Sequence, residues 1–191
     1  MTVFSAPRHP KITRALDEAR TWCAGHIIDD RPALVHAVRV AVTLARHVSD
    51  PPPDMIAAAL LHDSPLFAPS TIDLPEHLTR HYTPEVTRIV SALHAEHLAL
   101  NTPNPSLDTS DPAVLLISTA DKIIAFDSLV RRAHASGDPT AFFAQRGALL
   151  RLLPHFRAVS DATRPHVPST MATHLDNSLR TLTALTHTRP C

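Results

Sequence analysis

Glycine, cysteine and long apolar runs are scarce in this sequence of 191 residues. Only three residues are glycine, which disfavours tight hairpins, and the sequence has no glycine-rich fingerprint for a nucleotide phosphate. The apolar runs are far too short to span a membrane, and the amino-terminal residues lack the apolar core of a signal peptide. The two cysteines, Cys23 and Cys191, do not make a disulfide framework, which fits a reducing compartment. These absences together predict a cytoplasmic protein.

An excess of charge of either sign is also lacking. The 18 basic and 18 acidic residues give a formal net charge of zero, and no basic block stands out. Binding to nucleic acid or to a membrane surface through charge is therefore not expected. A hydrophobic content of 44% and a length of 191 residues are typical of one soluble domain with a sizeable core. We expect a single domain over 1–191, with its core at about 12–135 and carboxy-terminal helices at about 140–187.

Proline is plentiful, and the 18 prolines stand between apolar segments, where they mark helix ends. Apolar residues recur at helical spacing, and there is no strand alternation or internal repeat. The sequence therefore predicts an all-α bundle. The expected helices cover about 11–26, 33–48, 54–64, 84–100, 112–135, 140–162 and 168–187, with a shorter one near 74–82, a loop at 25–32 and a loose leader at 1–10.

The segment from Pro51 to Pro69 holds the most informative motif. Asp54 can cap a helix after the prolines, the apolar run MIAAALL continues it, and Pro65 ends it. His62 and Asp63 then lie in the last turn of a buried helix, where an imidazole and a carboxylate can bind a metal. A His-Asp pair is expected about once by chance in this composition, so a capped and solvated helix end is the alternative.

Two further residues place metal-ligand chemistry inside apolar helices. His36 is flanked by apolar residues in the helix at 33–48, and Asp121 lies one turn after Ile117 in the helix at 112–135. A buried ionised carboxylate is costly unless it is paired or bound to a metal. Taken singly, His36 also reads as a hydrogen-bonded core residue, and Asp121 as one half of an ion pair, for example with Arg39.

Taken together, LVHAVRVA, AALLHD and STADKI resemble, in that order, the HD-domain metal-dependent phosphohydrolases. The likeness covers about residues 12–135 and is strongest to the hydrolase domain of the RelA/SpoT alarmone enzymes and the small alarmone hydrolases. It implies an HD-domain helical bundle that binds a divalent metal, manganese by preference, with zinc or iron as alternatives. Such a cation lowers the pKa of a coordinated water to about 7. The implied substrate is a small phosphate ester or pyrophosphate, of a nucleotide, and the implied metal ligands are His36, His62, Asp63 and Asp121.

The sequence departs from this family pattern at four positions. Leu66 and Phe67 stand where alarmone hydrolases carry a Glu-Asp pair that handles water and proton. Ala125 replaces an asparagine that contacts the nucleotide, and Ala33 replaces a tyrosine before the first histidine. Loss of a general base typically costs ~10² to 10⁴ in rate. A catalytically degenerate protein that binds metal, nucleotide or a partner is therefore the main alternative function.

Other side chains can take over the missing acid–base role. His94 and His97 lie three residues apart on one helix face with Glu96 between them, so His94 and Glu96 are catalytic candidates. With His81, these histidines can instead extend the metal set, as in dinuclear HD oxygenases similar to myo-inositol oxygenase. His26 is a further catalytic candidate by analogy with family members that have a histidine there. A plain polar helix face is the alternative for His94 and His97.

Phosphate contact is expected from Arg31, five residues before His36, and from Lys122, next to Asp121. A surface position without phosphate contact is the alternative for both residues. Arg131 and Arg132 are expected in a solvated turn of helix. The carboxy-terminal helices are expected either to cover the cleft or to form the face of a homodimer.

Overall fold

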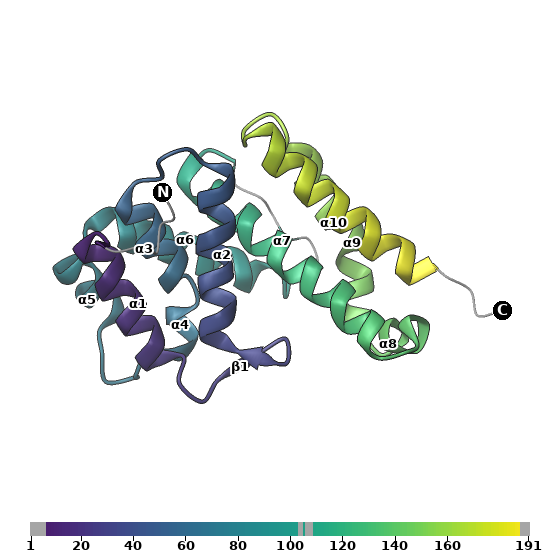
Figure 1. Ribbon diagram of the computed structural model, residues 1–191, viewed down its shortest axis with the longest axis horizontal. Coiled ribbons are helices and arrows are strands. Elements are labelled where there is room, and N and C mark those ends of the chain that lie inside the picture. The colour runs from purple at the N-terminus through teal and green to yellow at the C-terminus, as the bar shows by residue number, and fades with distance from the viewer. Residues whose placement is uncertain (1–6, 103–104, 106–108, 188–191) are drawn as a thin grey trace.

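The computed structural model describes residues 7–102, 105 and 109–187, and the predicted all-α architecture is confirmed over these ranges (Figure 1). Residues 1–6 of the expected leader and Cys191 lie outside them. Cys23 is buried and its thiol is not in a disulfide. The helices are α1 (Pro10–Trp22), α2 (Ala33–His47), α3 (Pro53–Leu61), α4 (Ser64–Phe67), α5 (Leu74–His81), α6 (Pro84–Ala99), α7 (Pro112–Ala135), α8 (Pro139–Ala144), α9 (Gly147–Thr163) and α10 (Ser169–His187).

Proline and capping side chains set many of the helix starts. Thr83 accepts a hydrogen bond from the backbone of Val86 at the start of α6, and the Asp111 carboxylate accepts two at the start of α7. The expected cap of α3 was wrong. Pro52 occupies the N-cap position, and Asp54 lies in the first turn, where its carboxylate accepts a hydrogen bond from Lys11 Nζ at 2.6 Å. The first turn of a helix has unpaired N–H groups, which favour a carboxylate in that turn.

Two segments differ from the sequence expectation. The loop at 25–32 contains a small antiparallel pair, β1 (Ile27–Ile28) and β2 (Arg31–Pro32), joined by Asp29 and Asp30 at φ of 54° and 62°. Two consecutive residues of positive φ are what a two-residue hairpin turn needs, and aspartate tolerates them. The single helix expected at 140–162 is two, α8 and α9, and the Arg146 guanidinium donates to the carbonyl of Phe142 at the end of α8.

The long helix α7 organises the bundle. In Figure 1 it runs between the amino-terminal helices and the group formed by α8, α9 and α10. It packs against α2 on one side and α10 on the other. Buried apolar side chains form one cluster that reaches from Ile12 in α1 to Leu182 in α10. Within the described ranges, no helix combines the length and the apolar character that crossing a bilayer requires.

The short helix α3 lies at the centre of the amino-terminal part and contacts α1, α2, α6 and α7. Its residues from Ile56 to Leu61 are all buried, and alanines 57–59 allow the close approach of its neighbours. The chain therefore delivers the two residues that follow this helix, His62 and Asp63, to the interior of the bundle.

Candidate metal centre

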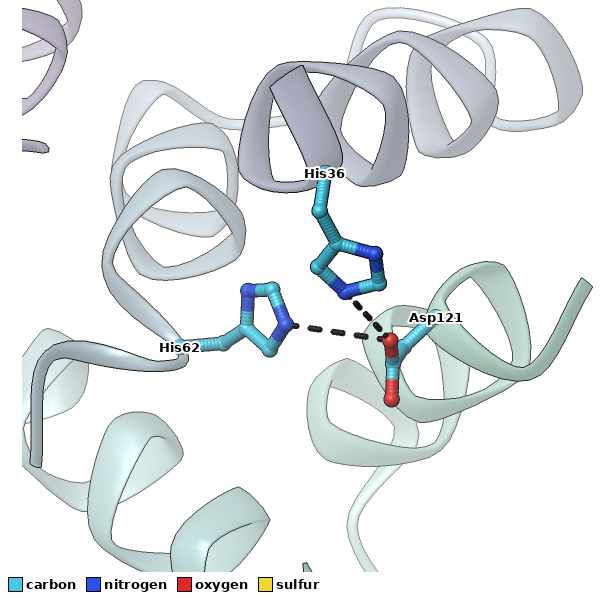
Figure 2. A group of neighbouring side chains, drawn as sticks. All are labelled: His36, His62 and Asp121. Carbon is cyan, nitrogen blue, oxygen red and sulfur yellow. Dashed lines mark ion pairs between the residues drawn. The ribbon is translucent and has the colours of Figure 1, made fainter. Parts of the chain in front are cut away.

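The four predicted metal ligands come together at the meeting point of α2, α3 and α7. One ligand atom from each of His36, His62 and Asp121 lies within 4.8 Å of the others (Figure 2). His36 Nε2 is 2.9 Å and His62 Nε2 is 3.8 Å from Asp121 Oδ1. Asp63 Oδ2 is 3.2 Å from His62 Nε2 and 3.8 Å from His36 Nε2. Two imidazoles and two carboxylates thus surround one small volume.

Adjacent residues in a helix point about 100° apart, so His62 and Asp63 need a change of chain direction to face the same point. The helix expected at 54–64 was too long at its end: α3 ends at Leu61, before His62 and Asp63, and Asp63 has φ of −91° and ψ of 3°, outside the regular helical region. Pro65 then sits in the first turn of α4, where its missing N–H costs nothing. The turn between α3 and α4 therefore places both side chains in the cluster.

His62 has the clearest signature of a ligand. Its Nδ1 lies 2.9 Å from the carbonyl oxygen of Ala59, which can only accept, so Nδ1 carries the proton. Its Nε2 is buried and has no hydrogen-bond partner among the described residues, although two carboxylates stand nearby. A nitrogen lone pair aimed at carboxylate oxygens is unfavourable unless a positive charge lies between them. A divalent cation bound here would supply that charge, and a backbone carbonyl that fixes the other ring nitrogen is typical of metal-binding histidine.

Electrostatics keep Asp121 in the ionised form that ligation needs, whereas without a metal they favour the protonated form of His36. Burial by itself opposes ionisation of Asp121, but hydrogen bonds from His36 and His97 hold the pKa of this carboxyl well below its usual range. Burial lowers the pKa of His36, yet the hydrogen bond to Asp121 and the charges of Asp121 and Asp63 outweigh it and leave the pKa raised. Asp121 is therefore an anion at neutral pH, although it is almost completely buried.

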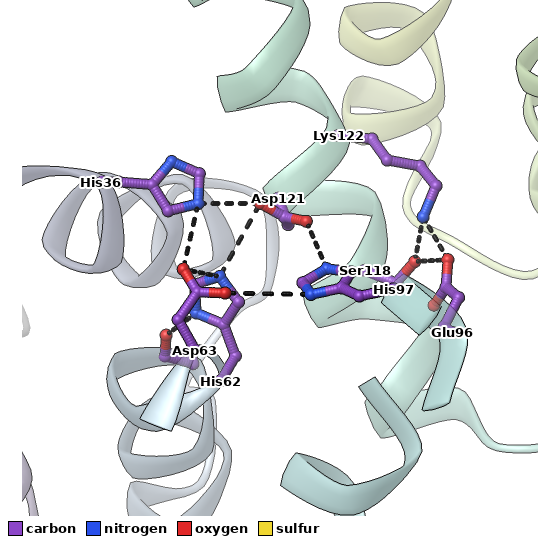
Figure 3. A network of polar contacts seen from close by, with 9 residues as sticks. His36, His62, Asp63, Glu96, His97, Ser118, Asp121 and Lys122 are labelled. Carbon is purple, nitrogen blue, oxygen red and sulfur yellow. Dashed lines mark hydrogen bonds and ion pairs between the residues drawn. The ribbon is translucent and has the colours of Figure 1, made fainter. Parts of the chain in front are cut away.

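A fifth residue, His97 of α6, completes the cluster. Its Nε2 is 3.1 Å from Asp121 Oδ2, and its Nδ1 is 3.8 Å from Asp63 Oδ1 (Figure 3). The sequence analysis put His94 forward as a catalytic residue, and it offered His97 with His94 and His81 as an extension of the metal set. Among the described residues, His94 has no hydrogen bond or ion pair with the cluster. The buried stripe of α6 does not separate the two, because His97 lies one turn after Leu93 and His94 lies one turn after Val90.

Comparison with known proteins identifies the fold. No family model matches the chain, and no curated protein matches its sequence. A solved structure, that of a metazoan ortholog of SpoT that hydrolyses ppGpp, superposes with a TM-score of 0.62 over 92% of this chain and 97% of that chain. The chain has the HD-domain fold. Sequence identity over this match is 18%, so the similarity is one of fold.

Within this HD fold, Glu96 and Lys122 are paired with each other. Lys122 Nζ contacts Glu96 Oε1 and lies 2.7 Å from Ser118 Oγ, which itself donates to Glu96 Oε1 at 2.8 Å (Figure 3). The Lys122 side chain is 7% exposed and that of Glu96 is 14% exposed. Glu96 was predicted as an acid–base residue and Lys122 as a phosphate contact. Either role would require this internal pair to separate.

The remaining candidates lie around the HD centre rather than in it. The ring of His26 stacks on Phe67 with centroids 4.6 Å apart, and the neighbouring Leu66 is 59% exposed. Arg31 lines a small hollow that His36 also lines. His81 lies 2.7 Å from an Arg14 guanidinium nitrogen and packs against another histidine of α5, outside the cluster. The positions at which alarmone hydrolases carry a Glu-Asp pair thus have one solvent-facing leucine and one stacked phenylalanine in this chain.

Proposed function

We propose that this protein is a metal-dependent hydrolase of a phosphate ester or pyrophosphate, with a nucleotide as its substrate. One observation carries the proposal: the buried Nε2 of His62 has no hydrogen-bond partner among the described residues and faces two carboxylates. The ligands in this proposal are His36, His62, Asp63 and Asp121, and the metal is Mn²⁺, with Zn²⁺ or Fe²⁺ as alternatives. The shared fold with a protein that hydrolyses ppGpp supports the reaction class.

A divalent cation held by these residues would lower the pKa of a coordinated water and offset the charge on a phosphoryl oxygen. The residues around the centre hold the donor atoms in position for the metal. Asp121 stays ionised because His36 and His97 hydrogen-bond to its two oxygens. The Ala59 carbonyl fixes the ring of His62, so that its Nε2 faces the centre without reorganisation.

A nucleotide is favoured because apolar surface lies next to the centre. Ile27 is 65% exposed and Leu66 is 59% exposed, and they are the sequence neighbours of the stacked His26 and Phe67. Exposed apolar and ring surfaces of this kind suit the flat, largely apolar face of a base.

The test is a release assay on the full chain. Protein supplemented with Mn²⁺ is incubated with a panel of nucleotide mono-, di- and triphosphates and nucleotides phosphorylated at two positions, and released phosphate and pyrophosphate are measured. We expect metal-dependent release that is lost in Asp121→Asn. Asp127→Asn is the matched control, because Asp127 lies on the same helix but accepts a hydrogen bond from Ser178 instead. Metal-saturated protein that turns over no member of the panel would refute the enzyme proposal.

A second function is favoured by Leu66 and Phe67. Neither side chain can accept a proton, and Phe67 is engaged with His26, so the acid–base group that the alarmone hydrolases carry there is missing. The second candidate is therefore a protein that binds metal and nucleotide without cleaving it. Saturable nucleotide binding by calorimetry, together with no release in the assay above, would support this candidate over the hydrolase.

A further inference from the structure

Three arginines gather beside His36 without acidic partners. Arg31 lies in β2, Arg39 in α2 and Arg131 in α7, and none of them forms an ion pair with a described residue. The contrast is with Arg132, which donates to Asp29 at 2.7 Å and Asp30 at 2.6 Å. The expectation of a solvated turn at 131–132 was wrong, since both arginines are partly buried.

The surroundings of Arg131 are unfavourable for a cation. Its Nη2 donates to Ser128 Oγ at 2.9 Å, but its Nε is buried and has no hydrogen-bond partner in the described part of the chain. Burial, and then the positive charges of Arg31 and Arg39, lower the pKa of Arg131. Like charges held close together cost free energy unless an anion lies among them.

The arginines adjoin the metal centre. Arg31, Arg39, Ser128 and His36 line one hollow of about 10 Å³. That volume holds about one water, so a larger anion would lie across its mouth, next to Arg31 and Arg39, which line the hollow. Asp29, which also lines the hollow, is neutralised by its pair with Arg132.

We propose that Arg31, Arg39 and Arg131 form an anion subsite that binds a second phosphate group of the substrate, apart from the one at the metal centre. Guanidinium groups bind phosphate oxygens in pairs, and the buried Nε of Arg131 is a donor without a hydrogen-bond partner among the described residues. The inference rests on the proposed function for the identity of the substrate, but the anion subsite itself does not require turnover.

The probe is inorganic pyrophosphate, titrated calorimetrically into the full chain in EDTA at low salt, so that no metal contributes. We expect saturable binding whose Kd rises about 10-fold in Arg39→Gln and in Arg131→Gln. Arg80→Gln is the control for net charge. Arg80 lies in α5, where it is exposed and forms an ion pair with Glu76. We expect its Kd to stay within about twofold of the parent value.

The variant Arg39→Lys controls for misfolding, because lysine keeps the positive charge and the aliphatic part of the side chain. We expect an intermediate Kd, because an ammonium cannot bind two oxygens in the fixed geometry of a guanidinium. No pyrophosphate binding, or an equal loss in Arg39→Gln and Arg80→Gln, would overturn the subsite. Arginine-dependent binding without turnover of any nucleotide would uphold the subsite and refute the hydrolase, so the two proposals fail separately.

Discussion

His97 Nε2 lies 3.1 Å from Asp121 Oδ2, while the other oxygen of the same carboxylate faces His36 and His62. The two oxygens of Asp121 therefore have different partners. His97 holds Oδ2 from α6, which leaves Oδ1 towards the proposed metal position. A carboxylate anchored in this way cannot rotate freely, and such anchoring partners strengthen metal binding.

Replacing His97 by glutamine should weaken metal binding without removing a ligand. We expect the Kd for Mn²⁺, measured by electron paramagnetic resonance of the free ion, to rise about 10- to 100-fold with unchanged stoichiometry. His94→Gln is the matched control, because His94 has no hydrogen bond or ion pair with the cluster among the described residues. Equal affinities for the two variants would show that the contact between His97 and Asp121 does not position the carboxylate.

Glu96→Gln should destabilise the protein strongly. The change leaves the buried ammonium of Lys122 without its counter-charge, which typically costs about 3–5 kcal/mol in the free energy of unfolding. Urea unfolding followed by circular dichroism measures this cost. We expect the double variant Glu96→Leu/Lys122→Met to recover most of the loss, because no charge is then buried. A double variant as unstable as the single one would argue against an uncompensated charge as the cause.

Protonation of His47 should loosen the contact between α2 and α10. Its ring lies 3.0 Å from Thr170 Oγ1 and 3.2 Å from His174 Nδ1, and burial followed by the charges of His174 and Arg46 lowers its pKa. The unfolded chain, with an ordinary histidine pKa of about 6.5, then binds the proton more readily than the folded protein. This contribution to stability is present above about pH 6.5 and is lost as the pH falls below it.

The measurement is the Tm of the parent and of His47→Gln between pH 8 and 5.5. The site histidine His36 has a raised pKa and acts in the opposite direction, so the difference between the two proteins is the informative quantity. We expect the Tm of His47→Gln to fall less on acidification than that of the parent. Identical pH profiles would mean that His47 does not sense pH in the folded protein.

Restoring the family's acid–base pair should raise turnover. Leu66 is exposed, so Leu66→Glu places a carboxylate in solvent at little cost, whereas Phe67→Asp also removes the stack on His26. We expect the double variant to hydrolyse the best nucleotide of the panel about 10² times faster or more. The readout is kcat at saturating Mn²⁺. An unchanged kcat, with nucleotide binding intact, would favour the binding protein over the hydrolase.

Structural features that depend on one residue or on a short motif could be predicted from the sequence. Prolines and capping side chains located the starts of α6 and α7 within a residue, since their effect is local. The motif order brought forward His36, His62, Asp63 and Asp121, which the structure places side by side. The metal identity, the homodimer, the single domain and the cytoplasmic location stay predictions.

Features that depend on how helices face one another could not be predicted. The choice between His94 and His97 depends on the rotation of α6 against α7, and three residues on a helix differ by about 60°. The pair of Glu96 and Lys122 and the gathering of Arg39 with Arg131 join residues from separate helices, so no local pattern reveals them. The motif pointed to the proposed ligands but not to the residues that hold them in place.

The metal content of the purified chain tests the central claim most directly. After supplementation with Mn²⁺ and removal of excess ion, elemental analysis should find about one metal per chain in the parent and in Asp127→Asn, and almost none in Asp121→Asn. A count of two would point instead to the dinuclear oxygenases. A parent protein without metal, or an Asp121→Asn variant that keeps its full complement, would contradict the account.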